Sequence, residues 1–267
     1  MKEIGIRSLS GLFYVFLIVG SAWISEIFFL SVISVFSGLA LLEFQRLQKV
    51  TSPFPYLVLM LLWVQSVFQI LPYIFTVLLL VTVSVINLYL ALTLFLQPNQ
   101  SFSKRFSFWA ALFYIVGSSY FILALSQIEP SLGMIPVLYV YATIWVNNSF
   151  AYVCGRSFGK TPLLPSISPK KTWEGFWGGF IFTLLLSVLI YMRQSYYSIW
   201  FFLSLGSIIA ILATLGDLIQ SKFKRLGAVK DSGSLIPGHG GFFDRMDSVL
   251  FSAPLIYAFY KLFQYVS

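Results

Sequence analysis

Residues 216–248 read GDLIQSKFKRLGAVKDSGSLIPGHGGFFDRMDS, and apolar runs long enough to cross a bilayer lie on both sides of them. The stretch holds all four aspartates of the chain, its only histidine and five cations: Asp217, Asp231, Asp244, Asp247, His239, Lys222, Lys224, Arg225, Lys230 and Arg245. So many ionisable groups cannot dissolve in lipid. They must line a wet cavity or lie at a membrane surface, and partly neutralise one another. Metal-assisted phosphate chemistry requires acids, cations and glycines together. Acids bind a divalent ion, cations bind phosphate oxygens, and glycines let the backbone approach the ligand closely.

The rest of the chain is unusually apolar. Of its 267 residues, 58% are hydrophobic and 10% are charged, whereas a soluble domain carries about a quarter charged residues. This composition is typical of a membrane protein. The net charge of +8 would suggest nucleic acid for a soluble protein, but in a membrane protein it reflects topology, so we expect no nucleic-acid partner. The single Cys154 excludes an internal disulfide.

Nine apolar runs have near-spanning length: about 8–25, 27–45, 54–71, 74–96, 107–127, 131–153, 174–193, 198–219 and 248–265. The first resembles a signal peptide but lacks a convincing small-residue cleavage site, so we interpret it as a retained first span. The predicted fold is an all-α integral membrane protein, a polytopic bundle of about nine transmembrane helices with a polar cavity on the cytoplasmic side. We divide it into residues 1–130, with about five spans, and residues 131–267, the catalytic region, with about four spans and the loops 154–173 and 220–247.

The positive charges predict the orientation. Fifteen of the 17 Lys and Arg residues lie at the N-terminus or after the second, fourth, sixth and eighth runs. Because cytoplasmic loops collect Lys and Arg, we expect a cytoplasmic N-terminus and an external C-terminus. The polar stretch would then face the cytoplasm from a multi-pass protein of the inner membrane.

A second polar segment, residues 155–180, reads GRSFGKTPLLPSISPKKTWEGFWGGF. Ser168-Pro169 predicts the start of a helix, with Thr172 in its first turn, where free backbone N–H groups favour an anion. The adjacent Lys170 and Lys171 could then bind the phosphates of a nucleotide or a lipid. A basic loop lying against acidic lipids explains the composition equally well.

The aspartates are spaced to converge. On a helix, Asp217, Gln220, Ser221 and Lys224 share one face, and Asp244 and Asp247 are three residues apart at the start of the last run. Together Asp217, Asp244 and Asp247 could supply the few oxygen ligands that Mg²⁺ accepts. Two alternatives remain open: Asp217 could pair with Lys224 or Ser221, and Asp247 could cap the last helix. We expect the glycine-flanked His239 to contact phosphate or to order its loop.

Several of these residues form longer motifs. Residues 221–225 (SKFKR), 230–233 (KDSG), 237–241 (PGHGG) and 244–247 (DRMD) resemble the signature of the phosphatidate cytidylyltransferase, or CDP-diacylglycerol synthase, family. Residues 168–175 (SPKKTWEG) resemble its second motif, and residues 145–160 resemble a third. The resemblance covers about residues 140–250, and the N-terminal half only by hydropathy. It implies joining of CTP and phosphatidic acid into CDP-diacylglycerol and pyrophosphate, with Mg²⁺ and often a monovalent cation such as K⁺. We expect membrane lipids as partners, and the protein could form a homodimer.

The resemblance also implies roles for individual residues. Asp217, Asp244 and Asp247 would be metal ligands or their close supports. Lys224, Arg225, Lys230 and Arg245 would neutralise phosphate, and Asp231 and His239 would order the same loop. Ser168, Lys170, Lys171 and Thr172, with Asn148 and Ser221, would bind CTP or the lipid phosphate. Two departures stand out: the family usually has aspartate where this chain has Asn148, and often glutamate where it has Gln220.

Other functions remain open from the sequence. Another CTP-dependent lipid enzyme, such as a polyprenol kinase or a cytidylyltransferase for a different lipid, would need similar residues. A weakly active relative is suggested by the two amides, because each replaces a carboxylate by a neutral group of the same shape. A transporter fits less well, because its ionic site would lie near the membrane midplane between repeated halves.

Overall fold

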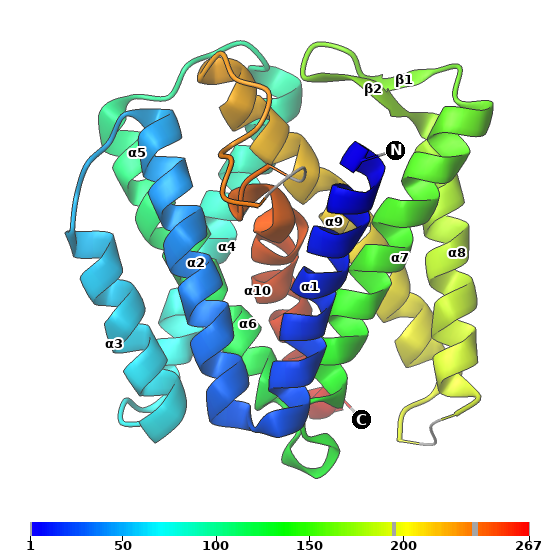
Figure 1. The fold of residues 1–267 in the computed structure, drawn as a ribbon. Coiled ribbons are helices and arrows are strands. Elements are labelled where there is room, and N and C mark those ends of the chain that lie inside the picture. The colour runs from blue at the N-terminus through cyan, green and yellow to red at the C-terminus, as the bar shows by residue number, and fades with distance from the viewer. Residues whose placement is uncertain (1, 194–195, 237–239, 267) are drawn as a thin grey trace.

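In the computed structural model, the chain forms a bundle of long helices with a small β-hairpin at one end (Figure 1). The structure describes residues 2–193, 196–236 and 240–266, with side chains described between residues 10 and 265 of those ranges. The elements are α1 (Lys2–Ile24), α2 (Glu26–Gln48), α3 (Phe54–Phe68), α4 (Tyr73–Leu96), α5 (Lys104–Ala110), η1 (Ala111–Gly117), α6 (Ser118–Ser126), η2 (Pro130–Leu132), α7 (Ile135–Phe158), β1 (Pro162–Leu164), β2 (Ser168–Thr172), α8 (Trp173–Tyr191), α9 (Ile199–Leu226) and α10 (Phe243–Val266).

The helices confirm the predicted all-α membrane bundle. Within the described residues, each of the nine predicted apolar runs lies in its own helix, α5, η1 and α6 being one continuous helix. Five helices of the described chain are long and apolar enough to span a bilayer, namely α2, α4, Lys104–Ser126, α8 and α9, and α1 and α3 add shorter apolar segments. The chain is therefore a multi-pass membrane protein. The remaining long helices, α7 and α10, carry several of the polar residues described below.

The outside of the bundle is apolar. Phe16 of α1 is 70% exposed, Leu78 of α4 60% and Leu189 of α8 60%. So large an apolar surface would aggregate in water, so lipid chains must cover it.

Two boundaries predicted around the second polar segment are wrong. Ser168 and Pro169 do not begin a helix; they lie in β2, which pairs antiparallel with β1 through Pro162 with Thr172 and Leu164 with Ser168. The helix begins at Trp173, and the Thr172 hydroxyl accepts a hydrogen bond from the Gly175 N–H at 3.2 Å as its N-cap. Cross-strand pairing satisfies the backbone of this segment, which local capping signals cannot reveal. The predicted loop 154–173 is also shorter, because α7 continues to Phe158.

The predicted loop 220–247 is shorter too. Helix α9 continues to Leu226, beyond the predicted end at 219, so the connection to α10 is residues 227–242. Hydropathy falls there because one face of the helix turns polar, while its opposite face stays packed: Phe223 is fully buried. Lys222 is 2% exposed and donates to the Thr93 and Gln97 carbonyls at 2.8 Å each. Its charge stabilises the C-terminal end of α4, so Lys222 is a structural cation.

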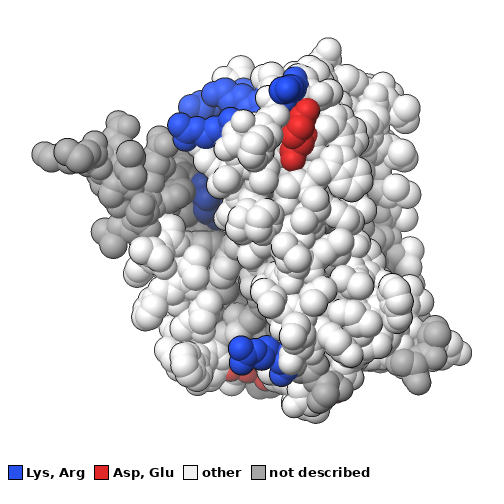
Figure 2. Space-filling view, turned by 90° about the vertical axis from the view of Figure 1, so that its right-hand side faces the viewer, with Lys and Arg blue, Asp and Glu red and all other residues white. Residues whose placement is uncertain are grey.

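The polar elements share one end of the bundle. Figure 1 places the N-terminus, the hairpin and residues 227–236 at the top, and the C-terminus at the opposite end. On the face shown in Figure 2, Lys and Arg gather mostly at this same upper end. The membrane orientation inferred from these charges stays a prediction.

Candidate active site

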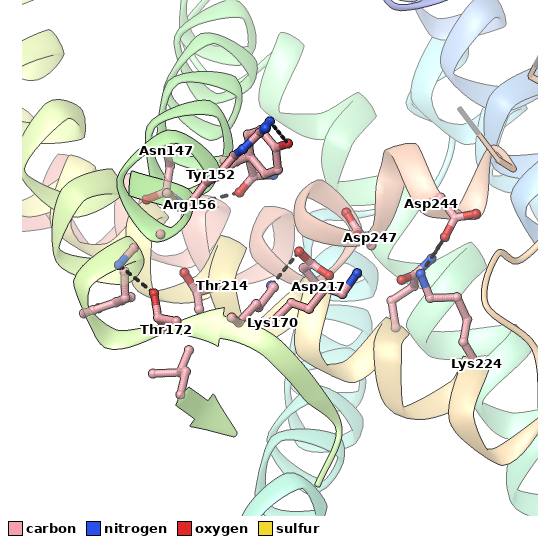
Figure 3. A pocket seen from close by; sticks show the side chains of 18 of the residues that line it. Asn147, Tyr152, Arg156, Lys170, Thr172, Thr214, Asp217, Lys224, Asp244 and Asp247 are labelled. Carbon is pink, nitrogen blue, oxygen red and sulfur yellow. Dashed lines mark hydrogen bonds and ion pairs between the residues drawn. The ribbon is translucent and has the colours of Figure 1, made fainter. Parts of the chain in front are cut away.

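A cavity of about 750 Å³ opens among α7, α8, α9, α10 and the hairpin (Figure 3). Charged and polar side chains from α7, the hairpin, α9, α10 and the loop before α10 line it: Asn147, Asn148, Tyr152, Arg156, Lys170, Lys171, Thr172, Thr214, Asp217, Gln220, Lys224, Asp231, Asp244, Arg245 and Asp247. Five of these residues are cations and four are the aspartates predicted from the sequence. The volume suits a nucleotide-sized ligand.

Asp217 of α9 and Asp247 of α10 lie on one wall of this cavity and are close enough to interact electrostatically. Gly216 makes this approach possible, because a methyl group there would meet the Asp247 carbonyl oxygen at 2.7 Å. Asp217 forms an ion pair with Lys171 at 2.5 Å and accepts a hydrogen bond from the Ser221 hydroxyl at 3.4 Å. The predicted pairing with Ser221 is therefore present, while Lys171 takes the place proposed for Lys224.

Asp247 is a buried carboxylate. It is 7% exposed and accepts a hydrogen bond from the Ser248 N–H. The ion pairs recorded among the described side chains are Lys171–Asp217 and Lys224–Asp244, so none of them neutralises Asp247. A buried carboxylate without a cation is unfavourable, which makes this wall a place where a bound cation would be stabilised.

Asp244 has a different environment from Asp247, although both lie in the first turns of α10 (Figure 3). Its Oδ1 accepts hydrogen bonds from Gln220 Nε2 at 2.5 Å and Lys224 Nζ at 2.8 Å. Its Oδ2 accepts from the Ser232 N–H and Gly241 N–H at 2.9 Å and lies 2.8 Å from the Ser232 hydroxyl. The lone pairs of this carboxylate are thus occupied by protein donors from α9 and the loop before α10.

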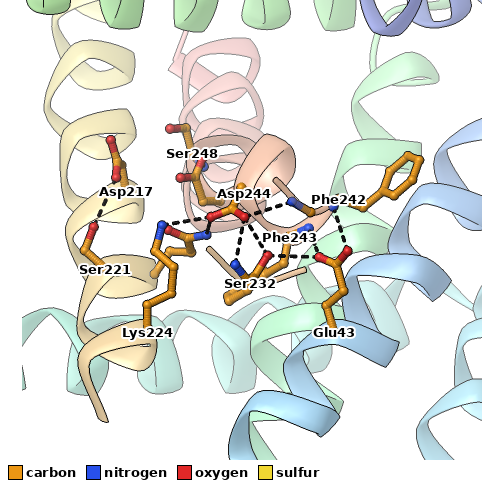
Figure 4. A network of polar contacts seen from close by, with 12 residues as sticks. Glu43, Asp217, Ser221, Lys224, Ser232, Phe242, Phe243, Asp244 and Ser248 are labelled. Carbon is orange, nitrogen blue, oxygen red and sulfur yellow. Dashed lines mark hydrogen bonds and ion pairs between the residues drawn. The ribbon is translucent and has the colours of Figure 1, made fainter. Parts of the chain in front are cut away.

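Glu43 of α2 is a functional candidate that the sequence analysis missed. It is 2% exposed, and its carboxylate accepts hydrogen bonds from the N–H groups of Phe242 and Phe243 at 3.1 and 2.9 Å. The Ser232 hydroxyl lies 2.9 Å from Glu43 and also contacts Asp244 (Figure 4). Glu43 therefore fixes the loop between α9 and α10 at Ser232 and at the start of α10. The available signal was an acid inside an otherwise apolar run, which is costly without a partner.

The hairpin is fixed to α8 by another acid. Glu174 accepts hydrogen bonds from the backbone N–H groups of Lys160 and Thr161 at 3.1 and 3.2 Å. The Trp173 N–H donates to the Thr161 carbonyl at 2.9 Å. These contacts hold the turn after α7 so that Lys170, Lys171 and Thr172 reach the cavity.

Four predicted residues do not line the cavity. Ser221 supports Asp217 from within α9, and the exposed Arg225 donates to the Ile167 carbonyl of the hairpin at 3.2 Å. Lys230 is exposed in the connecting loop, and Ser168 is partly buried in β2. His239 lies outside the described residues, so its predicted contact with phosphate or its loop stays a prediction.

A model of the cytidylyltransferase family matches residues 5–263, nearly the whole chain. The chain belongs to the cytidylyltransferase family. Curated relatives named phosphatidate cytidylyltransferase include proteins of Staphylococcus haemolyticus, 40% identical over 161 residues, and Staphylococcus epidermidis, 38% identical over 156 residues. A Staphylococcus aureus relative of the same name is also 38% identical over 156 residues. Each match spans 57% of this chain and 60% of the relative.

Both amides that depart from the family pattern have structural partners. Gln220 is fully buried and uses its amide N–H as a donor to Asp244, which a glutamate could not do while ionised. Asn148 donates to the Ser248 hydroxyl at 3.2 Å and accepts from Asn147 at 3.3 Å, linking α7 to α10. Each amide therefore supports the positions of site residues without adding charge.

The acidic residues of the cavity fit a Mg²⁺ ion whose remaining ligands are waters and phosphate oxygens. No group of three His, Cys, Asp or Glu side chains within the described residues is close enough to bind one ion. Mg²⁺ usually needs only one or two carboxylates when waters and substrate phosphates complete its shell. The unneutralised Asp247 beside Asp217 meets that requirement. The three-acid set with Asp244 stays a prediction.

Proposed function

We propose that this protein is a phosphatidate cytidylyltransferase, which joins CTP and phosphatidic acid into CDP-diacylglycerol and pyrophosphate. The observation that carries the proposal is the cavity in which cations from α7, α9, α10 and the hairpin face the Asp217–Asp247 wall. The family match and the names of the relatives support the same reaction. Helices that span the bilayer would let the lipid keep its chains in the membrane while its phosphate reaches this cavity.

The chemical step is an in-line displacement at the α-phosphorus of CTP. A phosphate oxygen of phosphatidate forms the new P–O bond, the bond to the β-phosphate breaks, and pyrophosphate leaves with the electron pair. Phosphatidate is already an anion, so the step needs no strong general base. The main barrier is the approach of two anions, so positioning and charge neutralisation should dominate.

The cavity residues divide this work by their geometry. Lys170, Lys171 and Arg156 lie where they can neutralise the triphosphate, and Lys224 is oriented by Asp244. Asp217 and Asp247 would hold Mg²⁺, which when bound supplies positive charge to the phosphate oxygens. We propose that Asp244 mainly organises the loop and Lys224, because its oxygens already accept protein hydrogen bonds. A monovalent cation such as K⁺ stays an expectation.

The location of the site follows from the same proposal. CTP is a cytoplasmic nucleotide, so the cavity end should face the cytoplasm of the inner membrane, as the positive charges predict. A homodimer remains a prediction, to be tested by mass measurement of the detergent-solubilised protein.

The decisive experiment follows the label of CTP. Purified protein is incubated with Mg²⁺, phosphatidate micelles and CTP labelled at either the α- or the γ-phosphate. We expect α-label in the lipid product and γ-label in pyrophosphate. Transfer of γ-label to lipid would instead establish a kinase, and label transfer to other lipid acids but not phosphatidate would establish a different cytidylyltransferase.

A further inference from the structure

A second cavity, of about 320 Å³, lies between α1, α7 and α10. It shares Asn148, Asp244, Arg245 and Asp247 with the main cavity, so the two hollows meet at one wall. Its other lining residues are Gly11, Tyr14, Val15, Tyr141, Ile144, Trp145, Ser149, Ser248 and Val249. Away from the shared wall, this hollow is therefore lined mainly by aromatic and aliphatic side chains.

The shared wall is a defined partition. Asn148 of α7 donates to the Ser248 hydroxyl of α10 at 3.2 Å, and that hydroxyl donates to the Ala213 carbonyl of α9 at 3.2 Å. This chain of hydrogen bonds fixes three helices where the two cavities adjoin. A ligand in each cavity could approach Asp247 from opposite sides of the partition.

The second cavity is bordered by one face of α1, and the other face of that helix is exposed. Tyr14 faces inward, is 7% exposed, and donates from its hydroxyl to the Arg245 carbonyl at 3.2 Å. The neighbouring Leu12, Phe13 and Phe16 are 60–70% exposed and face outward. Tyr14 also packs edge-on against Trp145 of α7, with ring centroids 6.4 Å apart. The cavity thus combines a lipid-exposed helix, aromatic walls and an ionic inner wall.

We propose that this second cavity holds the glycerol and upper acyl segments of an anionic diacyl phosphate lipid, with its phosphate at the Arg245–Asn148 wall. The nucleotide then occupies the main cavity, which carries Lys170, Lys171 and Arg156. The assignment rests on the proposed function for the identity of the lipid. It follows from continuity with the main cavity, from the apolar walls, and from the attraction between an arginine and a phosphate. The lipid phosphate and the α-phosphorus would meet at the partition.

Three positions on α7 allow a matched test. Ser149 lines the second cavity and not the main one, Tyr152 lines the main one and not the second, and Val153 lines neither and is 53% exposed. Each is replaced by cysteine in a Cys154→Ser background, which removes the one native thiol. The rate of maleimide labelling is measured for Ser149→Cys, Tyr152→Cys and Val153→Cys in phosphatidylcholine micelles.

Labelling should respond differently to the two substrates. Short-chain phosphatidate at about ten times its dissociation constant should slow labelling of Ser149→Cys about tenfold, because only the empty site reacts. CTP with Mg²⁺ should slow labelling of Tyr152→Cys and leave labelling of Ser149→Cys unchanged. Neither phosphatidate nor CTP should slow labelling of Val153→Cys. Protection of Ser149→Cys by CTP alone, or its full reactivity with phosphatidate, would overturn the proposal. If diacylglycerol, which has no phosphate, protects Ser149→Cys equally well, the proposed phosphate site at Arg245 and Asn148 is refuted.

The same variants keep this proposal separate from the proposed function. Each is also assayed for CDP-diacylglycerol formation and for its melting temperature. If product forms but phosphatidate does not protect Ser149→Cys, the lipid site in the second cavity is refuted and the proposed reaction is not. Lipid protection at Ser149→Cys without product from the parent protein refutes the proposed reaction but supports the lipid site. If Ser149→Cys does not fold, Val15→Cys, at a partly exposed position that lines the same cavity, takes its place in the comparison.

Discussion

The Glu43 carboxylate lies 2.9 Å from the hydroxyl of Ser232, a residue 189 positions further along the chain. The same hydroxyl lies 2.8 Å from Asp244, so α2 and α10 hold the loop from both sides. A buried acid from the N-terminal helices therefore helps to build a site whose other residues come from the C-terminal half. The proposed division at residue 130 stays a prediction, but the site draws on both parts.

Replacement of Glu43 should loosen this loop. Glu43→Gln puts an amide N–H where a carboxylate oxygen now accepts, leaving backbone N–H groups of Phe242 or Phe243 unpaired. We expect a loss of stability of about 1–3 kcal/mol, seen as a lower melting temperature in detergent. Trypsin cleavage after Lys230 should also accelerate. Glu26→Gln, at an exposed acid of the same helix, is the control and should change neither reading.

Gly241 should tolerate no side chain. A methyl group there would collide with both oxygens of the Glu43 carboxylate, so Gly241→Ala must displace the loop. We expect turnover and melting temperature to fall together, with a cost of about 1–3 kcal/mol. Gly20→Ala is the control, because its nearest neighbour would be a Phe16 side-chain atom at 3.9 Å. Equal effects of the two substitutions would contradict the close packing of Gly241 against Glu43.

Asp244 and Asp247 should separate stability from catalysis. Asp247→Asn removes a buried charge that forms no ion pair with a described residue, so metal-free melting should stay equal or rise while turnover falls by about a hundredfold or more. Asp244→Asn removes the acceptor of Lys224 and the loop N–H groups, so it should also lower the melting temperature. Turnover is titrated with Mg²⁺ for each variant. Equal destabilisation by both would refute this separation.

Lys171 should matter more than Lys160. Lys171 reaches Asp217 inside the cavity, whereas Lys160 is exposed and does not line it. We expect Lys171→Met to reduce kcat/KM for CTP about ten- to a hundredfold, as for a lost charged hydrogen bond of about 1.5–3 kcal/mol. Lys160→Met should change it by less than about threefold, because exposed cations contribute little. Steady-state kinetics at fixed phosphatidate decides between them.

Gln220 should not be replaceable by glutamate in this chain. Its amide nitrogen lies 2.5 Å from Asp244 Oδ1, so Gln220→Glu would place two carboxylates in contact. Like charges at that distance repel, so Lys224 and the loop should shift, and both turnover and melting temperature should fall. Higher Mg²⁺-dependent turnover in Gln220→Glu would show instead that the missing acid limits this enzyme.

Much of the fold was predictable from local properties. The nine apolar runs mark nine helices of the described chain, because a span must be long and apolar whatever its neighbours are. The convergence of Asp217, Asp244 and Asp247 on one cavity was also predictable, since helical spacing places each near the same end. The start of α8 was placed wrongly because residues 168–172 pair with β1 as a strand, so the helix begins only at Trp173.

The sequence by itself determined the membrane class, the span pattern and the stretch that carries the ionisable groups, because these depend on composition and periodicity alone. The tertiary structure decided which carboxylate is satisfied and which is not. Asp244 and Asp247 look alike in the sequence, yet one accepts hydrogen bonds from α9 and the loop, while the other is buried without a described ion pair. Partners that lie far apart in sequence set the electrostatic environment of a buried group, and only the packed chain brings them together.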